Sequence, residues 1–118
     1  MSNDVLTVAT QNLVLAFNSL NKTQQYLGGQ YSSDTYTGAT TQVYLGKSRL
    51  VAVNIIVTGG SIEVYNTASK DVLLQKNLIF TLDSTAIIGN YQVGAECQNG
   101  IAFVVTAPTV ANITYSVY

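Results

Sequence analysis

The side chains that carry most enzyme and metal chemistry are scarce in this sequence. Histidine is absent, Cys97 is the single cysteine, and the six acidic residues stand singly, without the spacing of a calcium loop. Without imidazole, a common general base and metal ligand is missing. A lone thiol can form neither an intrachain disulfide nor a multi-cysteine metal cage. We therefore expect no catalytic residues, no metal and no cofactor, and a protein that is not an enzyme.

Hydrolysis and phosphate binding each need a motif that the sequence lacks. No serine lies in a Gly-x-Ser-x-Gly turn, and Gly59-Gly60 does not open a phosphate-binding loop with a following Lys. A glycosidase needs two carboxyl groups about 5–10 Å apart, so Glu63 and Glu96 qualify only if the fold brings them together. An enzyme acting on polysaccharide is the third alternative.

The tyrosines are the best candidates for binding, because an amphipathic ring can stack on a sugar or fill a protein interface. The sequence has eight tyrosines, and four of them follow one another from residue 26 to residue 44: Tyr26, Tyr31, Tyr36 and Tyr44. We predict that these four contact a partner. Packing at a protein interface is the favoured interpretation, and a glycan site is the alternative.

The charge content is low for a soluble domain. Five Lys and Arg and six Asp and Glu amount to 9% of 118 residues, whereas soluble domains average about 25%. Polarity comes instead from 41 Ser, Thr, Asn and Gln residues, which cost less to desolvate at an interface than charges do. The composition therefore indicates assembly with partners. A net charge of −1 provides no basic surface for nucleic acid.

No segment of the sequence is typical of a membrane span or a secretory signal. The longest apolar runs, such as residues 101–105, are much shorter than the ~20 residues that cross a bilayer. The N-terminus has no basic region followed by an apolar stretch. We therefore expect no membrane partner and synthesis in the cytoplasm.

An N-terminal helix is predicted over about residues 4–27, within an oligomerisation segment 1–29. Asn3 or Asp4 can cap its start, and Gly28-Gly29 favours its end. Its a and d heptad positions form what we call the seam: Leu6, Ala9, Leu13, Ala16, Leu20, Thr23 and Leu27.

The apolar stripe of this helix is wider than the seam. Phe17 lies at the edge of the seam, and Val5 and Val14 widen the stripe further. We infer that the helix needs more than one neighbour, which two further copies of the chain would supply in a homotrimer. The alternative is an amphipathic helix that lies across its own domain's sheet.

The rest of the chain, residues 30–118, is predicted to be an antiparallel β-sandwich, either jelly-roll or immunoglobulin-like, so that the whole protein is mainly β with one N-terminal helix. Residues 30–48 read as polar edge strand or loop. Gly59-Gly60 and Asn99-Gly100 are each predicted to close a tight hairpin. The predicted strands are 50–58, 61–65, 72–75, 78–82, 86–88, 91–97, 101–106 and 110–118.

Six short segments, taken in their order along the chain, carry a resemblance to a known group of proteins. They are Gln11-Asn12, Asn18-Ser19-Leu20-Asn21-Lys22-Thr23, residues 47–51, residues 60–69, residues 99–105 and residues 113–116. In this order they resemble small structural proteins of tailed bacteriophages. The resemblance implies a small, often trimeric β-sandwich of the capsid-decoration, cement or neck/tail-accessory kind, and it implies no catalytic residues.

The function expected from this resemblance is structural. We expect a virion protein, made in the bacterial cytoplasm, that stabilises the phage head by bridging neighbouring capsid subunits. Its partners are then other copies of itself and the major capsid or neck/tail proteins. The alternative is a neck/tail accessory or host-attachment module that binds surface glycans. Residues 31–44 depart from the usual pattern, which leaves open whether they bind capsid, a neighbour or a host surface.

Overall fold

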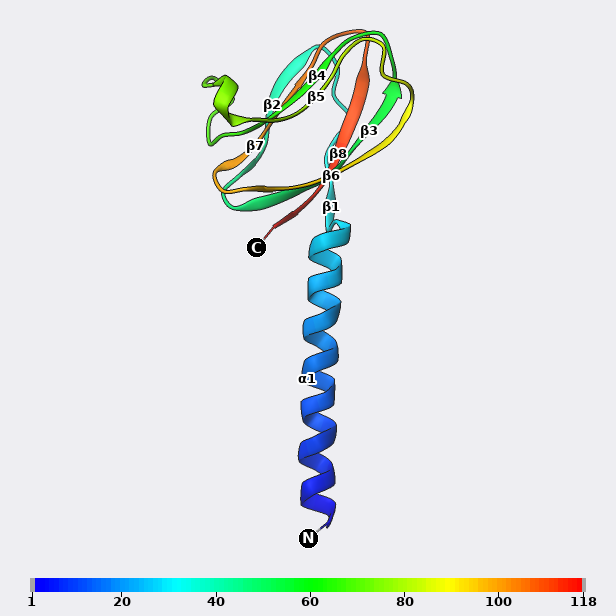
Figure 1. Cartoon of the computed structure of the whole chain (residues 1–118), viewed down its shortest axis with the longest axis vertical. Coiled ribbons are helices and arrows are strands. Elements are labelled where there is room, and N and C mark those ends of the chain that lie inside the picture. Colours follow the sequence, from blue (N-terminus) through cyan, green and yellow to red (C-terminus); the bar gives the residue numbers. More distant parts are fainter. Residues whose placement is uncertain (1, 118) are drawn as a thin grey trace.

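A long helix carries an eight-stranded β-sandwich at its C-terminal end (Figure 1). The computed structural model describes residues 2–117, with side chains from residue 7 onward. The molecule measures 68 × 28 × 20 Å, and its radius of gyration is 18.8 Å, against roughly 13 Å for a compact domain of this length. The helix projects away from the sandwich, and this accounts for the elongation.

The helix α1 spans Ser2–Gly28, which confirms the predicted N-terminal helix. Proline is absent from it, and glycine occurs only at its last position, so nothing breaks it earlier. It ends where Gly29 takes a left-handed φ of 102° and donates its backbone N–H to the Gln25 carbonyl at 2.9 Å. The Gly28-Gly29 pair therefore ends the helix as the sequence predicts.

The sandwich consists of two four-stranded antiparallel sheets, with strand orders β1-β8-β3-β6 and β2-β7-β4-β5. Strands pair as if one long hairpin had been folded over: β1 with β8, β2 with β7, β3 with β6 and β4 with β5. This is the strand order of a jelly roll, one of the two predicted topologies. The strands are β1 Tyr31–Ser32, β2 Ala39–Leu45, β3 Ser48–Val57, β4 Ile62–Asn66, β5 Leu78–Leu82, β6 Gly89–Cys97, β7 Gly100–Val105 and β8 Val110–Val117.

Both predicted hairpins are wrong. The strands on either side of Gly59-Gly60 are β3 and β4, which lie in different sheets, and so do β6 and β7 on either side of Gln98-Asn99. A Cβ at position 60 would lie 1.9 Å from the Thr106 carbonyl oxygen. Gly60 is therefore required where one crossover between the sheets packs against another, a role that the sequence alone does not separate from a hairpin turn.

Two predicted strands are also wrong. Residues 72–74 form an irregular loop that leads into a short 3₁₀ helix, Gln75–Asn77, and residues 86–88 belong to the loop between β5 and β6. In the second loop the Asp83 carboxylate accepts a hydrogen bond from the Thr85 backbone at 3.0 Å. Val72, Leu74, Ile87 and Ile88 are exposed. Their apolar side chains suggested strands, but no neighbouring strand pairs with them.

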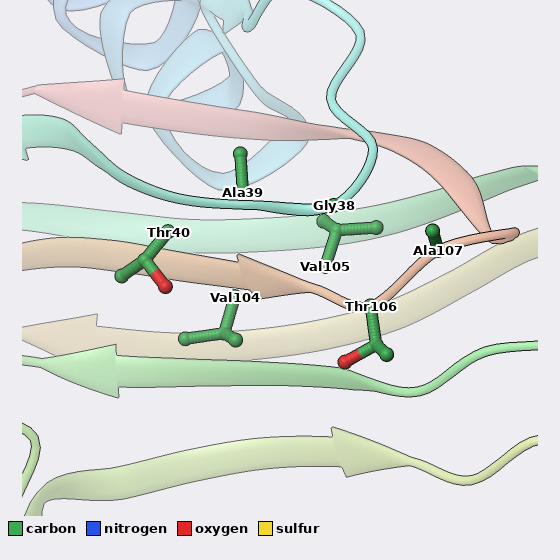
Figure 2. A pocket seen from close by; sticks show the side chains of 7 residues that line it. All are labelled: Gly38, Ala39, Thr40, Val104, Val105, Thr106 and Ala107. Atoms are coloured by element: carbon green, nitrogen blue, oxygen red, sulfur yellow. The ribbon is translucent and has the colours of Figure 1, made fainter.

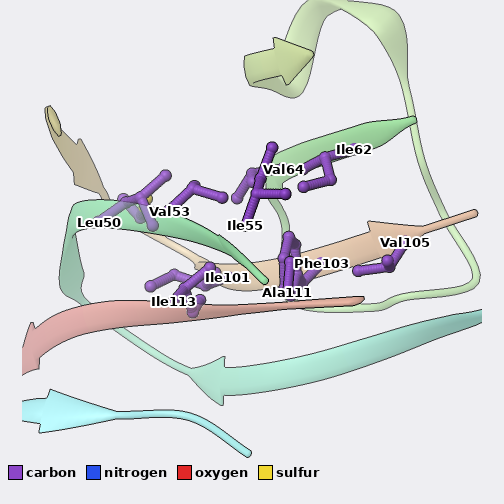
Figure 3. Close-up of a cluster of buried hydrophobic side chains, with 11 residues drawn as sticks. Leu50, Val53, Ile55, Ile62, Val64, Ile101, Phe103, Val105, Ala111 and Ile113 are labelled. Carbon is purple, nitrogen blue, oxygen red and sulfur yellow. The ribbon is translucent and has the colours of Figure 1, made fainter. Parts of the chain in front are cut away.

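The core lies between the two sheets and does not involve the helix (Figure 3). Side chains from β3 and β8 of one sheet meet those from β4 and β7 of the other. Phe103 is the largest fully buried side chain. The other core residues are Leu50, Val53, Ile55, Ile62, Val64, Cys97, Ile101, Val105, Ala111 and Ile113. The sandwich therefore has its own core, separate from the helix.

The junction between helix and sandwich is close-packed. Gly29 lies against Thr114 and Val51, and a Cβ at position 29 would stand 2.3 Å from Thr114 Cγ2. The next residue, Gln30, donates its backbone N–H to the Tyr115 carbonyl at 3.1 Å, and its side-chain oxygen accepts from the Val117 N–H at 3.1 Å. The chain therefore enters the sandwich alongside β8.

A polar link fixes the last turn of the helix to the β3–β6 side of the sheet. The Tyr26 hydroxyl donates to Glu96 Oε2 at 2.6 Å, and Arg49 Nη1 donates to Glu96 Oε1 at 3.0 Å. One carboxylate thus holds a residue of the helix and a residue of the sheet. This link, together with Gly29, sets the direction in which the helix leaves the sandwich.

Replacing Gly29 by Ala should weaken the junction, because Ala is strained at φ 102° and its methyl group would clash with Thr114. We expect Gly29→Ala to lower the free energy of unfolding by about 1–3 kcal/mol. Gly28→Ala is the matched control, since a Cβ there meets nothing within 4 Å, and it should be neutral or stabilising by up to about 1 kcal/mol. Urea unfolding at one fixed protein concentration measures both. Equal effects of the two substitutions would contradict this role of Gly29.

Candidate functional site

Among the described residues, the helix carries more exposed large apolar side chains than any other element. Every described side chain from residue 7 to residue 25 is exposed. Seven large apolar side chains on the helix are between 51% and 69% exposed: Val8, Leu13, Val14, Leu15, Phe17, Leu20 and Leu27. Apolar side chains exposed so extensively mark an interaction surface or an aggregation hazard.

The predicted seam lies along this surface and remains open to its end. Leu13, Leu20 and Leu27 are exposed, as are the small residues Ala9 and Ala16, while the Leu6 side chain lies outside the described residues. Leu27 is 51% exposed although it lies next to the last residue of the helix. The sandwich therefore leaves the seam accessible along its described length.

The alternative in which the helix packs across its own sheet is wrong. The helix leaves the sandwich end-on and extends away from it (Figure 1). Its main contacts are with β8 and β3, next to the junction. Phe17, beside the seam, is 61% exposed. The predicted oligomer-interface residues with described side chains are therefore all exposed.

The structure brings two of the four predicted partner tyrosines together, with a third that the sequence analysis did not single out. Tyr115 stands opposite Tyr31 in the pairing of β1 with β8, and their ring centroids are 5.5 Å apart. The ring centroid of Tyr44 also lies close to that of Tyr115, at 6.0 Å. Burial, followed by the neighbouring Tyr31 and Tyr44 hydroxyls, raises the pKa of Tyr115. We call Tyr31, Tyr44 and Tyr115 the tyrosine cluster.

The other two predicted tyrosines are held elsewhere. Tyr36 packs edge-on against Phe103 at 6.1 Å, and burial, then the nearby Asp34 and Tyr115, raise the pKa of its hydroxyl. Tyr26 binds Glu96 at the junction. Only the register of β1 against β8 places Tyr31 beside Tyr115, and that register is not readable from the sequence.

The acidic residues do not form a catalytic or metal site. Glu63, on β4, accepts a hydrogen bond from Tyr65, whereas Glu96, on β6 in the other sheet, binds Tyr26 and Arg49. The fold therefore gives the two glutamates different partners on different sheets. Among the described residues, no three His, Cys, Asp or Glu side chains lie close enough to hold a metal ion.

Two hollows on the described surface are shallow. One of about 280 Å³ lies where β2 begins and β7 ends, and its walls are small or aliphatic residues with two threonines (Figure 2). Another, of about 460 Å³, lies at the junction and is lined by Lys22, Thr23, Tyr26, Gln30 and Val117. The first offers no titratable group, and the second brings one lysine and one tyrosine beside neutral polar groups.

Within the part of the chain that the structure describes, no helix combines the length and the hydrophobicity needed to cross a membrane. Comparisons of the chain with protein-family models, curated proteins and solved structures found no match. The two candidate binding surfaces of the chain are the exposed helix and the tyrosine cluster, and the helix is the stronger candidate.

Cys97, at the end of β6, should be unreactive in the folded protein. It is fully buried, and this burial raises the pKa of its thiol to about 11. The thiolate is the reactive form, so at pH 8 the native thiol should react with iodoacetamide on the order of 100-fold more slowly than the chain in concentrated urea. The native rate should continue to rise up to about pH 11. Alkylation at equal rates in native and unfolded protein would contradict this.

Proposed function

We propose that this protein is a non-enzymatic structural protein that assembles through its helix and presents its jelly roll to a larger assembly. The observation that carries the proposal is the open seam. Leu13, Leu20 and Leu27 stand exposed on a helix that its own sandwich does not cover. Each such side chain gains about 1.5–3 kcal/mol when it is fully buried, so bundling with copies of the helix is strongly favoured.

A trimer is the form of bundle that we propose. Phe17 widens the apolar stripe beyond the seam and is 61% exposed, so a single partner helix would leave part of the stripe in water. Two partners can cover both edges of the stripe. Because the exposed seam continues to Leu27, copies can pack in parallel up to the base of the sandwiches.

The setting that we propose is the virion of a tailed bacteriophage, where the protein decorates or cements the capsid by bridging neighbouring subunits. This part of the proposal is supported by the resemblance of the segment order in the sequence. The jelly-roll topology adds an analogy of fold, because this topology occurs in viral capsid and lectin domains, and a fold alone does not fix function. A surface with 9% charged residues also suits burial between neighbouring proteins.

Replacing Leu13 by Asp should dissociate the trimer, because it would bury an unpaired carboxylate in the seam. We expect the mass of Leu13→Asp from light scattering to fall to that of a 12.6 kDa monomer. Asn21→Asp is the matched control. It adds the same charge at heptad position b, on the outside of the bundle, and should leave the trimer intact. The proposal fails if Leu13→Asp keeps the mass of the unmodified protein.

The tyrosine cluster favours a second candidate function, which is attachment to surface glycans. Tyr31 is 52% exposed. The ring centroid of Tyr115 lies 5.5 Å from that of Tyr31 and 6.0 Å from that of Tyr44. Aromatic rings with hydroxyl groups can stack on a sugar and hydrogen-bond to it. The cluster joins β1 of one sheet to β2 of the other, so a sugar bound there would lie beside the helix junction.

A glycan array probed with the purified full chain tests this second candidate. Selective retention of a sugar should be lost in Tyr31→Ala and kept in Tyr31→Phe, because stacking needs the ring and not the hydroxyl group. Absence of selective retention by the unmodified protein would remove glycan attachment. Equal retention by Tyr31→Ala would place the sugar away from the cluster.

A further inference from the structure

Two phenol rings of the tyrosine cluster lie side by side across a pair of strands. Tyr31 on β1 stands opposite Tyr115 on β8 in the strand register. Their ring centroids are 5.5 Å apart and their planes differ by 33°, a separation at which aromatic side chains are in contact. Tyr44 also contacts Tyr115, at 6.0 Å and 47°. Tyr31 and Tyr115 are therefore the closest and most nearly parallel pair of the cluster.

Backbone hydrogen bonds hold this pair of rings together from both sides. The Gln30 N–H donates to the Tyr115 carbonyl at 3.1 Å, and the Ser33 N–H donates to the Ile113 carbonyl at 2.8 Å. Ser33 Oγ also accepts from the Ile113 N–H at 2.9 Å. The residues before and after β1 are thus bonded to β8, so the Tyr31 ring stays beside Tyr115 as long as β1 remains paired.

The two rings differ in their access to solvent. Tyr31 is 52% exposed, so a dissolved reagent can reach its phenol group. Tyr115 is half-buried. Exposed side chains move between rotamers rapidly, so the Tyr31 ring can make the small movement that brings one ring carbon of each tyrosine together. Tyr31 is therefore the mobile and accessible member of the pair, and Tyr115 is the fixed one.

We propose that Tyr31 and Tyr115 form a site of oxidative cross-linking, in which one carbon–carbon bond joins the two rings. A haem peroxidase with hydrogen peroxide removes one electron and the phenol proton from each tyrosine. The two phenoxyl radicals couple between ring carbons adjacent to the oxygens, and the hydrogens on these carbons move to the oxygens and restore both phenols. The chain loses two hydrogen atoms in total, and one hydrogen peroxide is reduced to two water molecules.

This cross-link would act as a covalent staple in a chain that cannot form a disulfide of its own. Cys97 is the single cysteine and is fully buried. A bond between residues 31 and 115 closes most of the sandwich into one loop, and a longer closed loop removes more entropy from the unfolded chain. The bond also fastens β1, the strand that follows the helix junction, to β8. The inference concerns a single chain and does not rest on the proposed trimer.

Other described tyrosines have surroundings that do not favour the same reaction. Tyr36 packs against Phe103, which has no phenol hydrogen to lose. Tyr26 and Tyr65 each donate the hydroxyl hydrogen to a glutamate. The Tyr91 hydroxyl donates to a backbone carbonyl. The structure therefore favours one bond within the tyrosine cluster over coupling between tyrosines at random.

Oxidation of the full chain by a haem peroxidase and limiting hydrogen peroxide tests this inference. The chain should lose the mass of two hydrogen atoms and gain the fluorescence of dityrosine, and fragmentation should place the bond between Tyr31 and Tyr115. Tyr31→Phe and Tyr115→Phe should each abolish this cross-link, because phenylalanine keeps the ring but lacks the phenol hydrogen. Tyr44→Phe is the matched control. It removes the member of the cluster outside the pair and should keep the cross-link.

The remaining outcomes also decide the matter. In denaturing electrophoresis the product should migrate as a single chain, and a product that consists only of joined chains overturns the inference. A bond between any other two tyrosines overturns it as well. The midpoint of urea unfolding should rise in the cross-linked protein and not in Tyr31→Phe treated with the same oxidant. An unchanged midpoint would contradict the role of the bond as a staple.

Discussion

The constraint on which the rest of this structure depends is the cost of keeping an apolar helix in water. The sandwich has a complete core of its own and contacts the helix mainly at one end. Leu13 and Leu20 therefore find no apolar cover within the chain. Because burial of each gains about 1.5–3 kcal/mol, we propose that the chain assembles through these side chains. The proposed assembly thus rests on the exposure of these side chains.

The junction makes that assembly geometrically useful. Gly29 and the contacts of Tyr26 and Arg49 with Glu96 fix the helix to the sandwich in one direction. A bundle of such helices would hold its jelly rolls at a defined end and orientation, as a protein that bridges repeated subunits requires. The low charge content fits the same picture, since neutral polar groups cost less than charges to bury between neighbours.

Local patterns in the sequence predicted the helix, its end at Gly28-Gly29, and a two-layer antiparallel architecture. These patterns gave the wrong connection between strands where that connection depended on which sheet each strand joins. Gly60 was expected in a hairpin, but it is required by the approach of the Thr106 carbonyl across a crossover. The tyrosine cluster was only half predicted for the same reason, because Tyr115 reaches Tyr31 through strand register. The seam was visible in the sequence because heptad spacing is local, whereas the separation of the helix from its own sheet was not.

Amide hydrogen exchange of the full chain, measured over a range of protein concentrations, tests the central claim most directly. If the helix is buried between copies, its amides from residue 7 to residue 27 should be strongly protected at high concentration and lose protection on dilution. The amides of β3 and β7 should stay protected throughout, because they belong to the independent core. Rapid exchange along the helix at every concentration, beside a protected sandwich, would contradict the account.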